Sequence, residues 1–292
     1  ARPATAESKL HNLKYEVASH LLDRLEDIKR DFPYALDVGC GLGHVREALR
    51  SVPGAGGIET LLQTDCSREM VRFCQESQST AASGDLALRY LVADEEFLPF
   101  QDDSFDLVLS SMAMHWVNDL PGMLLQVRRC LKPDGAFLGA MLGQSTLDEL
   151  RVSLLLAEQE VESGVSQHIS PMTQMSDVAG LVWGAGFRLP VVDYDTYTLE
   201  FQDMYELMRE LRHAGDGNAA IGRRHFVPRA TFDRAAEIYA DKFGNANGTI
   251  RATFQVIYMI GWKEHESQQK PLKRGSATAK LRDVLEKDDE AK

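Results

Sequence analysis

The sequence has little cysteine, a deficit of basic side chains and no long apolar run, and each shortage argues against a class of protein. Its four cysteines are scattered over 292 residues without a C-x-x-C pair, so neither a disulfide framework nor a zinc site is predicted. Lys and Arg total 32 against 44 for Asp and Glu, a net charge of −12, which argues against a nucleic-acid surface. No apolar run approaches the roughly 20 residues that cross a bilayer, so any membrane association is expected to be peripheral.

The most informative stretch joins an apolar run to three glycines at alternate positions. Residues 35–44 read A-L-D-V-G-C-G-L-G-H, which is typical of the first strand of a doubly wound sheet turning into a helix. Glycine there permits a tight turn with positive φ and lets a ligand approach the backbone. The G-x-G-x-G spacing differs from the G-x-G-x-x-G of dinucleotide folds, and Asp37 would lie poorly beside a pyrophosphate. An acid suits a cation such as S-adenosylmethionine (SAM), with its sulfonium and ammonium groups; a plain structural turn is the alternative.

Acidic residues also end the next two predicted strands. Residues 58–65 end at Asp65, whose carboxylate is predicted to accept the ribose hydroxyls, as the equivalent acid does in nucleotide-binding βαβ folds. Residues 87–94 end at Asp94, which we expect to accept from the adenine amino group while Phe97 or Leu98 covers the ring. For each acid, a solvated position at a strand end or in a loop is the alternative.

Strands and helices alternate through the first half of the chain. Further strands are expected at 105–111 and 136–141, with helices at 45–49, 68–75 and 120–131 and a turn at 132–135, which together predict an open α/β sheet. The run 105–109 is nearly all apolar, as expected of a central parallel strand buried on both faces. Strands 188–201 and 253–262 are expected to pair as an antiparallel hairpin, with helices at 204–211 and 229–243 between them.

Two segments are expected to surround the ligand edge. The amphipathic helix 10–28 is predicted to cover the core, with a lid over the ligand as the alternative. Ser145 is expected to cap a helix that carries Leu150, Leu154 and Leu155 inward and turns Glu149 and Arg151 toward substrate, although exposed helix charges are more often solvated. The loop 164–175, which contains His168, is expected to close over the site.

The order of these motifs resembles class I SAM-dependent methyltransferases across roughly residues 35–142. More narrowly, four runs resemble the mitochondrial complex I assembly factor 5 family: residues 93–100 (A-D-E-E-F-L-P-F), 115–121 (H-W-V-N-D-L-P), 168–171 (H-I-S-P) and 258–263 (Y-M-I-G-W-K). The resemblance implies a matrix protein, peripheral to the inner membrane, that acts on an early assembly intermediate of NADH:ubiquinone oxidoreductase. It also implies a methyltransferase-like enzyme that hydroxylates an arginine of an iron–sulfur subunit. A more distant similarity is to malonyl-acyl-carrier-protein O-methyltransferases of biotin synthesis.

The expected fold is therefore an α/β, Rossmann-like, seven-stranded, mostly parallel sheet with an antiparallel last strand and a helical insertion. We place an N-terminal capping helix at 1–32, the SAM-binding domain at 33–263 with its insertion at about 202–249, and a polar, disordered tail at 264–292. SAM is the predicted cofactor and S-adenosyl-L-homocysteine its product. The predicted cofactor-binding residues are Asp37, Gly39, Gly41, Gly43, Asp65, Cys66, Asp94, Glu95 and Ser110.

Catalytic residues are harder to predict, because methyl transfer needs mainly positioning and exclusion of water. His115 follows the fourth strand and is the first candidate for a general base or substrate contact; a structural histidine packed on Trp116 is the alternative. His168 and Arg151 are weaker candidates. Ser110-Ser111-Met112-Ala113 stands where amide methyltransferases carry N-P-P-Y, which disfavours methylation of amide nitrogen.

The histidine pattern bears on hydroxylation. None of the eight histidines has Asp or Glu two positions later, so half of the common iron-binding triad is missing and no metal ligand is predicted. Two other functions stay open: a non-catalytic assembly chaperone that retains a SAM pocket, and a conventional O-methyltransferase for an acyl-carrier or small-molecule substrate. A nucleotide dehydrogenase is the least favoured.

Overall fold

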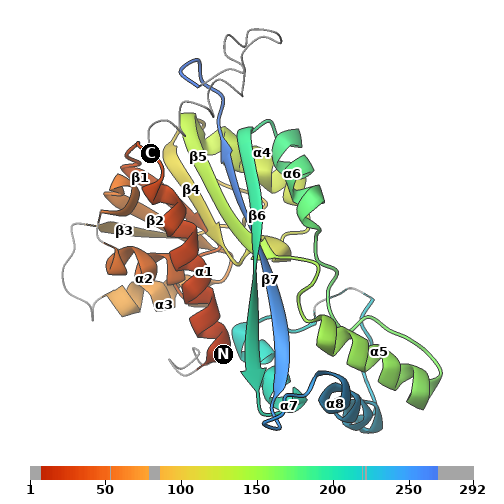
Figure 1. Ribbon diagram of the computed structural model, residues 1–292. Helices are drawn as coiled ribbons and strands as arrows, with labels where there is room; N and C mark the ends of the chain where they lie inside the picture. The colour runs from red at the N-terminus through yellow and green to blue at the C-terminus, as the bar shows by residue number, and fades with distance from the viewer. Residues whose placement is uncertain (1–7, 53, 79–85, 219, 221, 269–292) are drawn as a thin grey trace, which may run out of the picture.

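The computed structural model describes residues 8–52, 54–78, 86–218, 220 and 222–268, and they form one seven-stranded sheet (Figure 1). The strand order is β3-β2-β1-β4-β5-β7-β6; the first five strands are parallel, and β7 runs antiparallel to both β5 and β6. The predicted fold class and the predicted hairpin are confirmed. The strands are β1 (Tyr34–Val38), β2 (Thr60–Asp65), β3 (Ala87–Val92), β4 (Phe105–Ser111), β5 (Leu131–Leu142), β6 (Arg188–Phe201) and β7 (Ile250–Trp262).

The helices divide between the two faces of the sheet and its lower end. In Figure 1, α1 and α2 lie in front of the sheet and α4 and α6 behind it, while α5, α7 and α8 gather where the long strands β6 and β7 extend past their neighbours. The carboxyl ends of the parallel strands therefore face the group formed by α5, α7 and α8. The helices are α1 (Lys9–Glu26), α2 (His44–Ser51), α3 (Arg68–Gln78), α4 (Leu120–Cys130), α5 (Asp148–Glu162), α6 (Met175–Gly184), α7 (Met204–Ala214) and α8 (Arg229–Phe243).

Strand β4 lies between β1 and β5, and its side chains alternate between two hydrophobic clusters. Leu107 and Leu109 belong to the cluster under α1, whereas Val108 between them belongs to the cluster under α4 and α6; Phe105, also in the second cluster, precedes an irregularity in the strand ladder and does not follow this alternation. Period-two alternation with both faces buried is what a central parallel strand requires.

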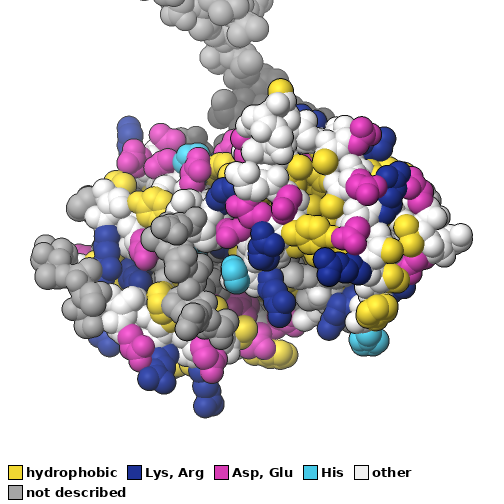
Figure 2. All heavy atoms as spheres, turned by 90° about the horizontal axis from the view of Figure 1, so that it is seen from below, with side chains coloured by type: hydrophobic (Ala, Val, Ile, Leu, Met, Phe, Trp, Pro, Cys, Tyr) yellow, Lys and Arg dark blue, Asp and Glu magenta, His cyan; other side chains and the backbone are white. Residues whose placement is uncertain are grey.

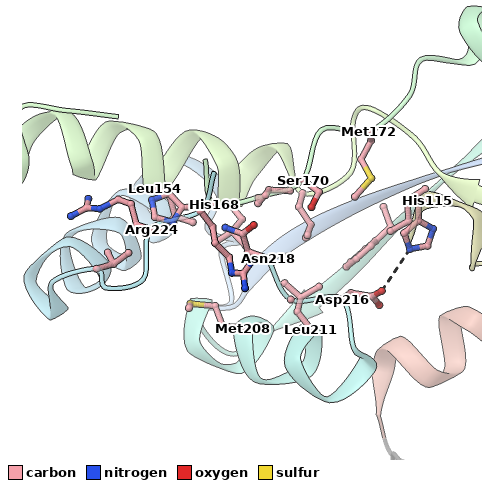
Figure 3. Close-up of a pocket in the computed structure, with 18 of the residues that line it drawn as sticks. His115, Leu154, His168, Ser170, Met172, Met208, Leu211, Asp216, Asn218 and Arg224 are labelled. Atoms are coloured by element: carbon pink, nitrogen blue, oxygen red, sulfur yellow. Dashed lines mark ion pairs between the residues drawn. The ribbon is translucent and has the colours of Figure 1, made fainter. Parts of the chain in front are cut away.

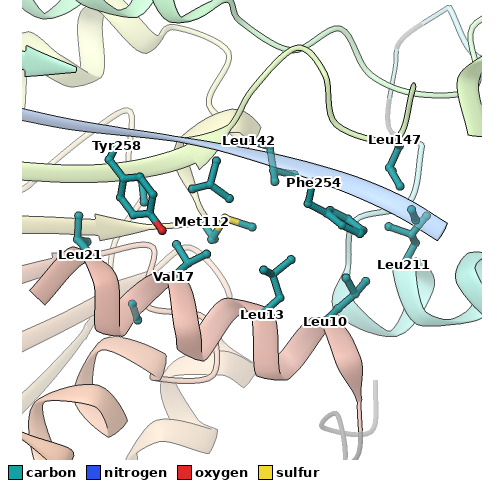
Figure 4. Packing of buried hydrophobic residues seen from close by; sticks show 14 of the residues in the cluster. Leu10, Leu13, Val17, Leu21, Met112, Leu142, Leu147, Leu211, Phe254 and Tyr258 are labelled. Carbon is teal, nitrogen blue, oxygen red and sulfur yellow. The ribbon is translucent and has the colours of Figure 1, made fainter. Parts of the chain in front are cut away.

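Helix α1 packs into the first of these clusters over its whole length (Figure 4). Its residues Leu10, Leu13, Val17 and Leu21 are all 2% exposed or less. Figure 4 shows them facing side chains of the sheet and of α7, namely Met112, Leu142, Leu211, Phe254 and Tyr258. Full burial of one such side chain contributes about 2 kcal/mol, so α1 is part of the core, as expected, and not a detachable lid.

Two local predictions are wrong. Residues 132–135 lie within β5 instead of before it: Leu131 pairs with Phe105 and Ala136 with Leu107, so the four residues form an irregularity in the ladder. Ser145 does not cap α5. The N-cap is Leu147 at φ 58°, without a side-chain cap, because the preceding residues bond to β7, where the Thr146 hydroxyl donates to the carbonyl of Gln255.

The predicted inward face of α5 is also partly wrong. Leu150 and Leu154 are buried, but Leu155 is 41% exposed. Glu149 does not face a ligand: it is buried and accepts hydrogen bonds from the backbone N–H and the hydroxyl of Thr253 on β7. The helix therefore turns one carboxylate into the fold to fasten itself to the sheet.

The lower face of the molecule carries charge of both signs. Figure 2 shows acidic and basic side chains interspersed around exposed hydrophobic ones on this face. No helix in the described part of the chain is long and apolar enough to cross a bilayer. Helices α7 and α8 fall within the predicted insertion, 202–249, and residues 269–292 of the predicted tail lie outside the described residues; the domain division stays a prediction.

Candidate functional site

A glycine loop joins β1 to α2 at the carboxyl edge of the sheet. Gly39, Gly41 and Gly43 have φ of 72°, 52° and 87°, a region in which other residues are strained. A Cβ on Gly39 would lie 2.3 Å from the Cβ of Ala113, in the segment after β4. Gly39 therefore has the positive φ that the sequence predicted, and its missing side chain makes room for Ala113; the approach of a ligand to this backbone stays a prediction.

Asp37 lies beneath this loop instead of on its surface. Its side chain is fully buried, Oδ2 accepts from Nε2 of Gln63 at 3.0 Å, and Oδ1 has no hydrogen-bond partner among the described residues. Burial raises the pKa of Asp37 to about 7; the Gln63 hydrogen bond opposes that rise and the nearby Asp65 adds to it. A cation held above the loop would favour the charged form of this carboxylate.

Asp65, at the end of β2, closes the loop from the other side. Its Oδ2 accepts from the N–H of Gly41 at 2.9 Å and its Oδ1 from the N–H of Ser67 at 2.8 Å. A carboxylate oxygen has further acceptor capacity, so these bonds orient Asp65 without exhausting it. Glu95 also reaches the loop, with Oε1 3.4 Å from the position that a Cβ on Gly39 would take.

The other predicted cofactor residues occupy different environments. Asp94 is exposed and accepts from the N–H of Glu96, and Phe97 beside it is 74% exposed, whereas Leu98 is buried in the second cluster. Ser110 is fully buried and its hydroxyl donates to the carbonyl of Val38, which ties β4 to β1.

Three possible metal ligands lie together at this edge. Side-chain atoms of Asp65, Cys66 and Glu95 are within 4.8 Å of one another. Both oxygens of Asp65 already accept backbone N–H groups, and the cluster coincides with the predicted ribose position. The residues present fit a cationic nucleoside: a loop of glycines that exposes backbone at Gly41, a carboxylate positioned at a strand end, and a buried acid with an oxygen that has no partner among the described residues.

A cavity of about 310 Å³ adjoins the sheet edge (Figure 3). It lies between the end of β4, helix α5, the loop 164–174 and the residues that follow α7. Its walls are mainly apolar and include Leu142, Leu147, Leu150, Leu154, Leu211 and Phe254. The volume and the apolar walls with a few polar groups are those of a binding site for a small ligand or a side chain.

His115 lines this cavity from the 3₁₀ turn Met114–Trp116 after β4. Its side chain is 4% exposed, Nε2 lies 3.7 Å from Oδ1 of Asp216, and neither ring nitrogen has a hydrogen-bond partner within the described residues. Its ring centroid is also 5.7 Å from that of Trp116, so the predicted packing on tryptophan is present together with the open polar atoms.

Asp216 is a site residue that sequence reasoning placed only in a loop. It follows the C-terminus of α7, its side chain is 10% exposed, and Oδ2 forms an ion pair with Nζ of Lys14 on α1 at 3.0 Å. Burial by itself would raise the pKa of Asp216, but His115 and Lys14 outweigh it and hold that pKa below its ordinary value. The only signal in the sequence was an acid between two glycines.

His168 lines the opposite part of the cavity and is fixed by Glu158. The Glu158 side chain is 1% exposed and accepts from the N–H and hydroxyl of Ser166, while His168 Nε2 lies at 3.0 Å and Arg224 Nη1 at 2.8 Å. Burial opposes ionisation, yet these partners lower the pKa of Glu158 to about 2. The loop 164–174 is thereby fastened to α5.

Arg151 lies apart from these residues. It does not line the cavity; its Nε pairs with Asp148 at 3.4 Å and its Nη2 donates to the carbonyl of Thr146. Of the three predicted catalytic residues, the structure therefore brings His115 and His168 to one cavity and leaves Arg151 outside it.

The chain matches known proteins in sequence and in fold. Residues 36–139 match the family model described as a methyltransferase domain. The YcgJ protein of Bacillus subtilis superposes with a TM-score of 0.55 at 19% identity, over 84% of this chain and 99% of that one. Phosphoethanolamine N-methyltransferase 2 of Haemonchus contortus, solved with SAM, superposes with a TM-score of 0.51 at 19% identity, over 87% of this chain and 53% of that one. The fold and the glycine loop thus define a protein of the methyltransferase class.

Sequence relatives narrow this class. The mitochondrial arginine-hydroxylase NDUFAF5 of Danio rerio is 47% identical over 95% of this chain and 83% of its own length, and that of Homo sapiens is 45% identical over 93% and 75%. The chain belongs to the NDUFAF5 family of methyltransferase-like mitochondrial enzymes. A malonyl-[acyl-carrier protein] O-methyltransferase of Methylovorus sp. is 32% identical over 86% of this chain and 82% of its own length.

Proposed function

We propose that this chain binds SAM and hydroxylates an arginine of an iron–sulfur subunit during early assembly of mitochondrial complex I. The observation that carries the proposal is the position of a mainly apolar cavity, ended by His115 and Asp216, beside a glycine loop suited to a cationic nucleoside. Relatives at 45–47% identity are arginine hydroxylases by name, and from them the proposal takes the arginine substrate and the hydroxylation. The proposal places the chain in the matrix, peripheral to the inner membrane.

The residues proposed to hold SAM are Asp37, Gly39, Gly41, Gly43, Asp65, Cys66, Asp94, Glu95 and Ser110. When bound, SAM supplies an activated methyl group beside a positive sulfonium. The chain contributes three features: backbone unshielded by side chains at the glycines, the orientation of Asp65 by two N–H donors, and the negative field of Asp37 below the loop.

On the substrate side, the chain's contribution is positioning and a proton acceptor. His115 is proposed as the residue that contacts the reacting side chain, because both ring nitrogens are free within the described residues and one faces a carboxylate. His168 is proposed to hold the loop 164–174 over the cavity through Glu158. For Arg151, the contacts with Asp148 and the Thr146 carbonyl at the start of α5 support a structural role instead.

The two reactions open to such a site leave different products. Hydroxylation replaces C–H with C–O–H, a two-electron oxidation that requires an external oxygen donor, such as dioxygen with a two-electron reductant, because SAM donates no oxygen. Methyl transfer from SAM is a displacement without oxidation, which releases S-adenosyl-L-homocysteine and a proton. The same arginine would therefore gain the mass of one oxygen atom in one case and of one methylene group in the other.

The test is intact-mass and peptide analysis of the iron–sulfur subunit produced with and without this chain. We expect a mass gain of one oxygen on one arginine, lost with His115→Phe and retained with the control His213→Phe, whose histidine is exposed on α7 and does not line the cavity. A methylene gain would replace hydroxylation with methylation. No modification, with normal assembly by a Gly39 variant that does not bind SAM, would establish an assembly chaperone.

The similarity to malonyl-[acyl-carrier protein] O-methyltransferases supports a second candidate, an O-methyltransferase for an acyl-carrier substrate. Its product would be a methyl ester on the carrier-bound acid. Incubation of the chain with SAM and malonyl-loaded carrier protein, followed by mass analysis of the carrier, detects that ester directly.

A further inference from the structure

The cavity has one end where unpartnered polar atoms are concentrated. Oδ1 of Asp216 and both ring nitrogens of His115 have no hydrogen-bond partner within the described residues, although these side chains are nine-tenths buried or more. Figure 3 shows the two side chains turned toward each other at this end of the cavity. Buried polar groups are almost always satisfied, so these atoms together indicate a ligand: Oδ1 of Asp216 and the acceptor nitrogen of His115 require donors, and the N–H of His115 requires an acceptor.

We propose that Asp216 binds the guanidinium group of the substrate arginine, with the unprotonated ring nitrogen of His115 as the second acceptor. This inference rests on the proposed function and adds the residue that selects the substrate. A guanidinium offers N–H donors in a rigid plane, so one can bond Oδ1 of Asp216 while a second bonds His115. Nε2 of His115 and Oδ1 of Asp216 are 3.7 Å apart, beyond hydrogen-bond distance of each other and close enough for both to accept from one planar cation.

The rest of the cavity suits the stem of the same side chain. Leucines 142, 147, 150, 154 and 211 and Phe254 line the walls, and they are favourable surroundings for the methylene groups of arginine. The two arginines that also line the cavity do not cancel the charge of Asp216. Arg224 is paired with Glu158 and Glu162, and Arg223 is exposed, where solvent and salt screen its charge.

Lys14 explains why a buried carboxylate is available in the free protein. Its Nζ contacts Oδ2 of Asp216 at 3.0 Å and also donates to the carbonyl of Ala214, so it fixes the end of α7 to α1. This pairing occupies Oδ2 of Asp216 and leaves Oδ1 for a ligand. The alternative is that Asp216 serves only to join α7 to α1. In that case, removal of Lys14 and removal of Asp216 should have the same effect.

Two probes of the same shape, one charged and one neutral, distinguish a guanidinium-binding Asp216 from an Asp216 that only joins helices. The full chain is titrated with N-acetyl-arginine amide and with N-acetyl-citrulline amide, in which a neutral ureido group replaces the guanidinium, and binding is followed by NMR. We expect the wild type to prefer the arginine probe by about tenfold, because a hydrogen bond to a charged partner is replaced by one between neutral groups. Asp216→Asn should bring the ratio close to one.

Lys14→Met is the matched variant, because it breaks the same ion pair but keeps the carboxylate. It should preserve or increase the preference for arginine, while thermal unfolding checks that both variants are folded. A wild type that binds neither probe, or binds both equally, overturns the proposal, as does an unchanged ratio in Asp216→Asn. A ratio lost equally in both variants makes Asp216 a residue that joins helices. Intact discrimination without an oxygen gain on the iron–sulfur subunit would refute the proposed function and leave this binding site standing.

Discussion

The glycine edge and the cavity lie on the same sheet, but backbone forms most of the first and side chains form the second. The glycine edge, defined by Asp37, Gly39, Gly41, Gly43 and Asp65, consists largely of backbone in special conformations. The cavity consists of side chains, with buried charges paired across elements that are far apart in the chain, as Lys14 and Asp216 are. At the glycine edge, positive φ at three glycines and the lack of space for a Cβ at Gly39 restrict the sequence, whereas in the cavity each buried charge must keep its partner.

The largest expected effect comes from Asp37, a fully buried acid of the glycine edge that forms no ion pair within the described residues. Asp37 has a folded pKa of about 7 against 3.8 for the ordinary group, so the folded protein keeps the proton that the unfolded chain releases. Stability is therefore expected to fall as pH rises from about 4 to about 7 and to stay lower above it. Asp37→Asn should raise the free energy of unfolding by roughly 4 kcal/mol at pH 8 and by little at pH 4.

Chemical denaturation across this pH range measures the difference between the two proteins. The same substitution should weaken SAM binding by about tenfold, because the cation loses a nearby negative charge. If the difference in stability between the two proteins did not change with pH, the protonation state of Asp37 would not differ between the folded and unfolded chains. Asp37 would then not differ from the paired charges of the cavity in the way proposed here.

Gly39→Ala is the next largest change. Its Cβ would lie 2.3 Å from the Cβ of Ala113 at a φ of 72°, so steric overlap and backbone strain both oppose folding. We expect a loss of about 3 kcal/mol in the free energy of unfolding and no measurable SAM binding by calorimetry.

Gly180→Ala is the control for that substitution. Gly180 lies within α6, and a Cβ there would meet nothing within 4 Å, so alanine should stabilise the helix by about 0.5–1 kcal/mol. If Gly39→Ala and Gly180→Ala changed the free energy of unfolding equally, steric overlap at Gly39 would not restrict the residue at that position.

The cavity gives the third effect through Glu158. Glu158→Gln removes a buried carboxylate that accepts from Ser166 and contacts His168 and Arg224, and should cost about 2 kcal/mol at pH 7. Because the folded pKa of about 2 is below the ordinary 4.5, this contribution is present above about pH 4.5 and is lost as pH falls toward 2. Hydrogen exchange should increase at residues 164–174.

Glu160→Gln is the matched control on the same helix. Its ion pair with Arg234 joins two half-exposed side chains, so little change in stability or exchange is expected. If Glu160→Gln loosened the loop as much as Glu158→Gln, burial of the charge would not be what fixes it.

The difference between the regions also explains what the sequence could predict. Asp37, the three glycines and Asp65 lie within a few residues of strand ends, so the local pattern predicted the sheet edge that they form. Gln63 was missed because its role depends on the neighbouring strand. The fold class, the hairpin and α1 were predicted from apolar periodicity, because this periodicity determines which face of each helix or strand is buried.

The cavity was predicted in part: at His115, where a strand end contributes to it, in the loop that carries His168, and at Leu150 and Leu154 on α5. Asp216 and Lys14 meet through the packing of α7 on α1, and Glu158 and Arg224 through the packing of α5 beside the loop before α8, and no local pattern encodes such contacts. Leu155 was placed inward for the same reason: a helix with leucines on adjacent positions does not say which of them faces the next helix.

Helix α1 contacts both regions, through His11 on His44, which follows Gly43, and through Lys14 on Asp216, and it gives the smallest predicted effect. The guanidinium of Arg24 lies 3.9 Å from the ring centroid of Tyr258 on β7, and its Nη2 also pairs with the partly exposed Asp193 on β6. Arg24→Gln should cost about 1 kcal/mol, the usual size of a partly buried cation–π contact, as measured by urea denaturation. Asp193→Asn removes the ion pair and keeps the ring contact, so it should cost much less. Equal losses would assign the effect to the ion pair. A larger loss in Arg24→Gln would mean that the link between α1 and the β6–β7 hairpin depends on aromatic packing, as the core does, more than on surface charge.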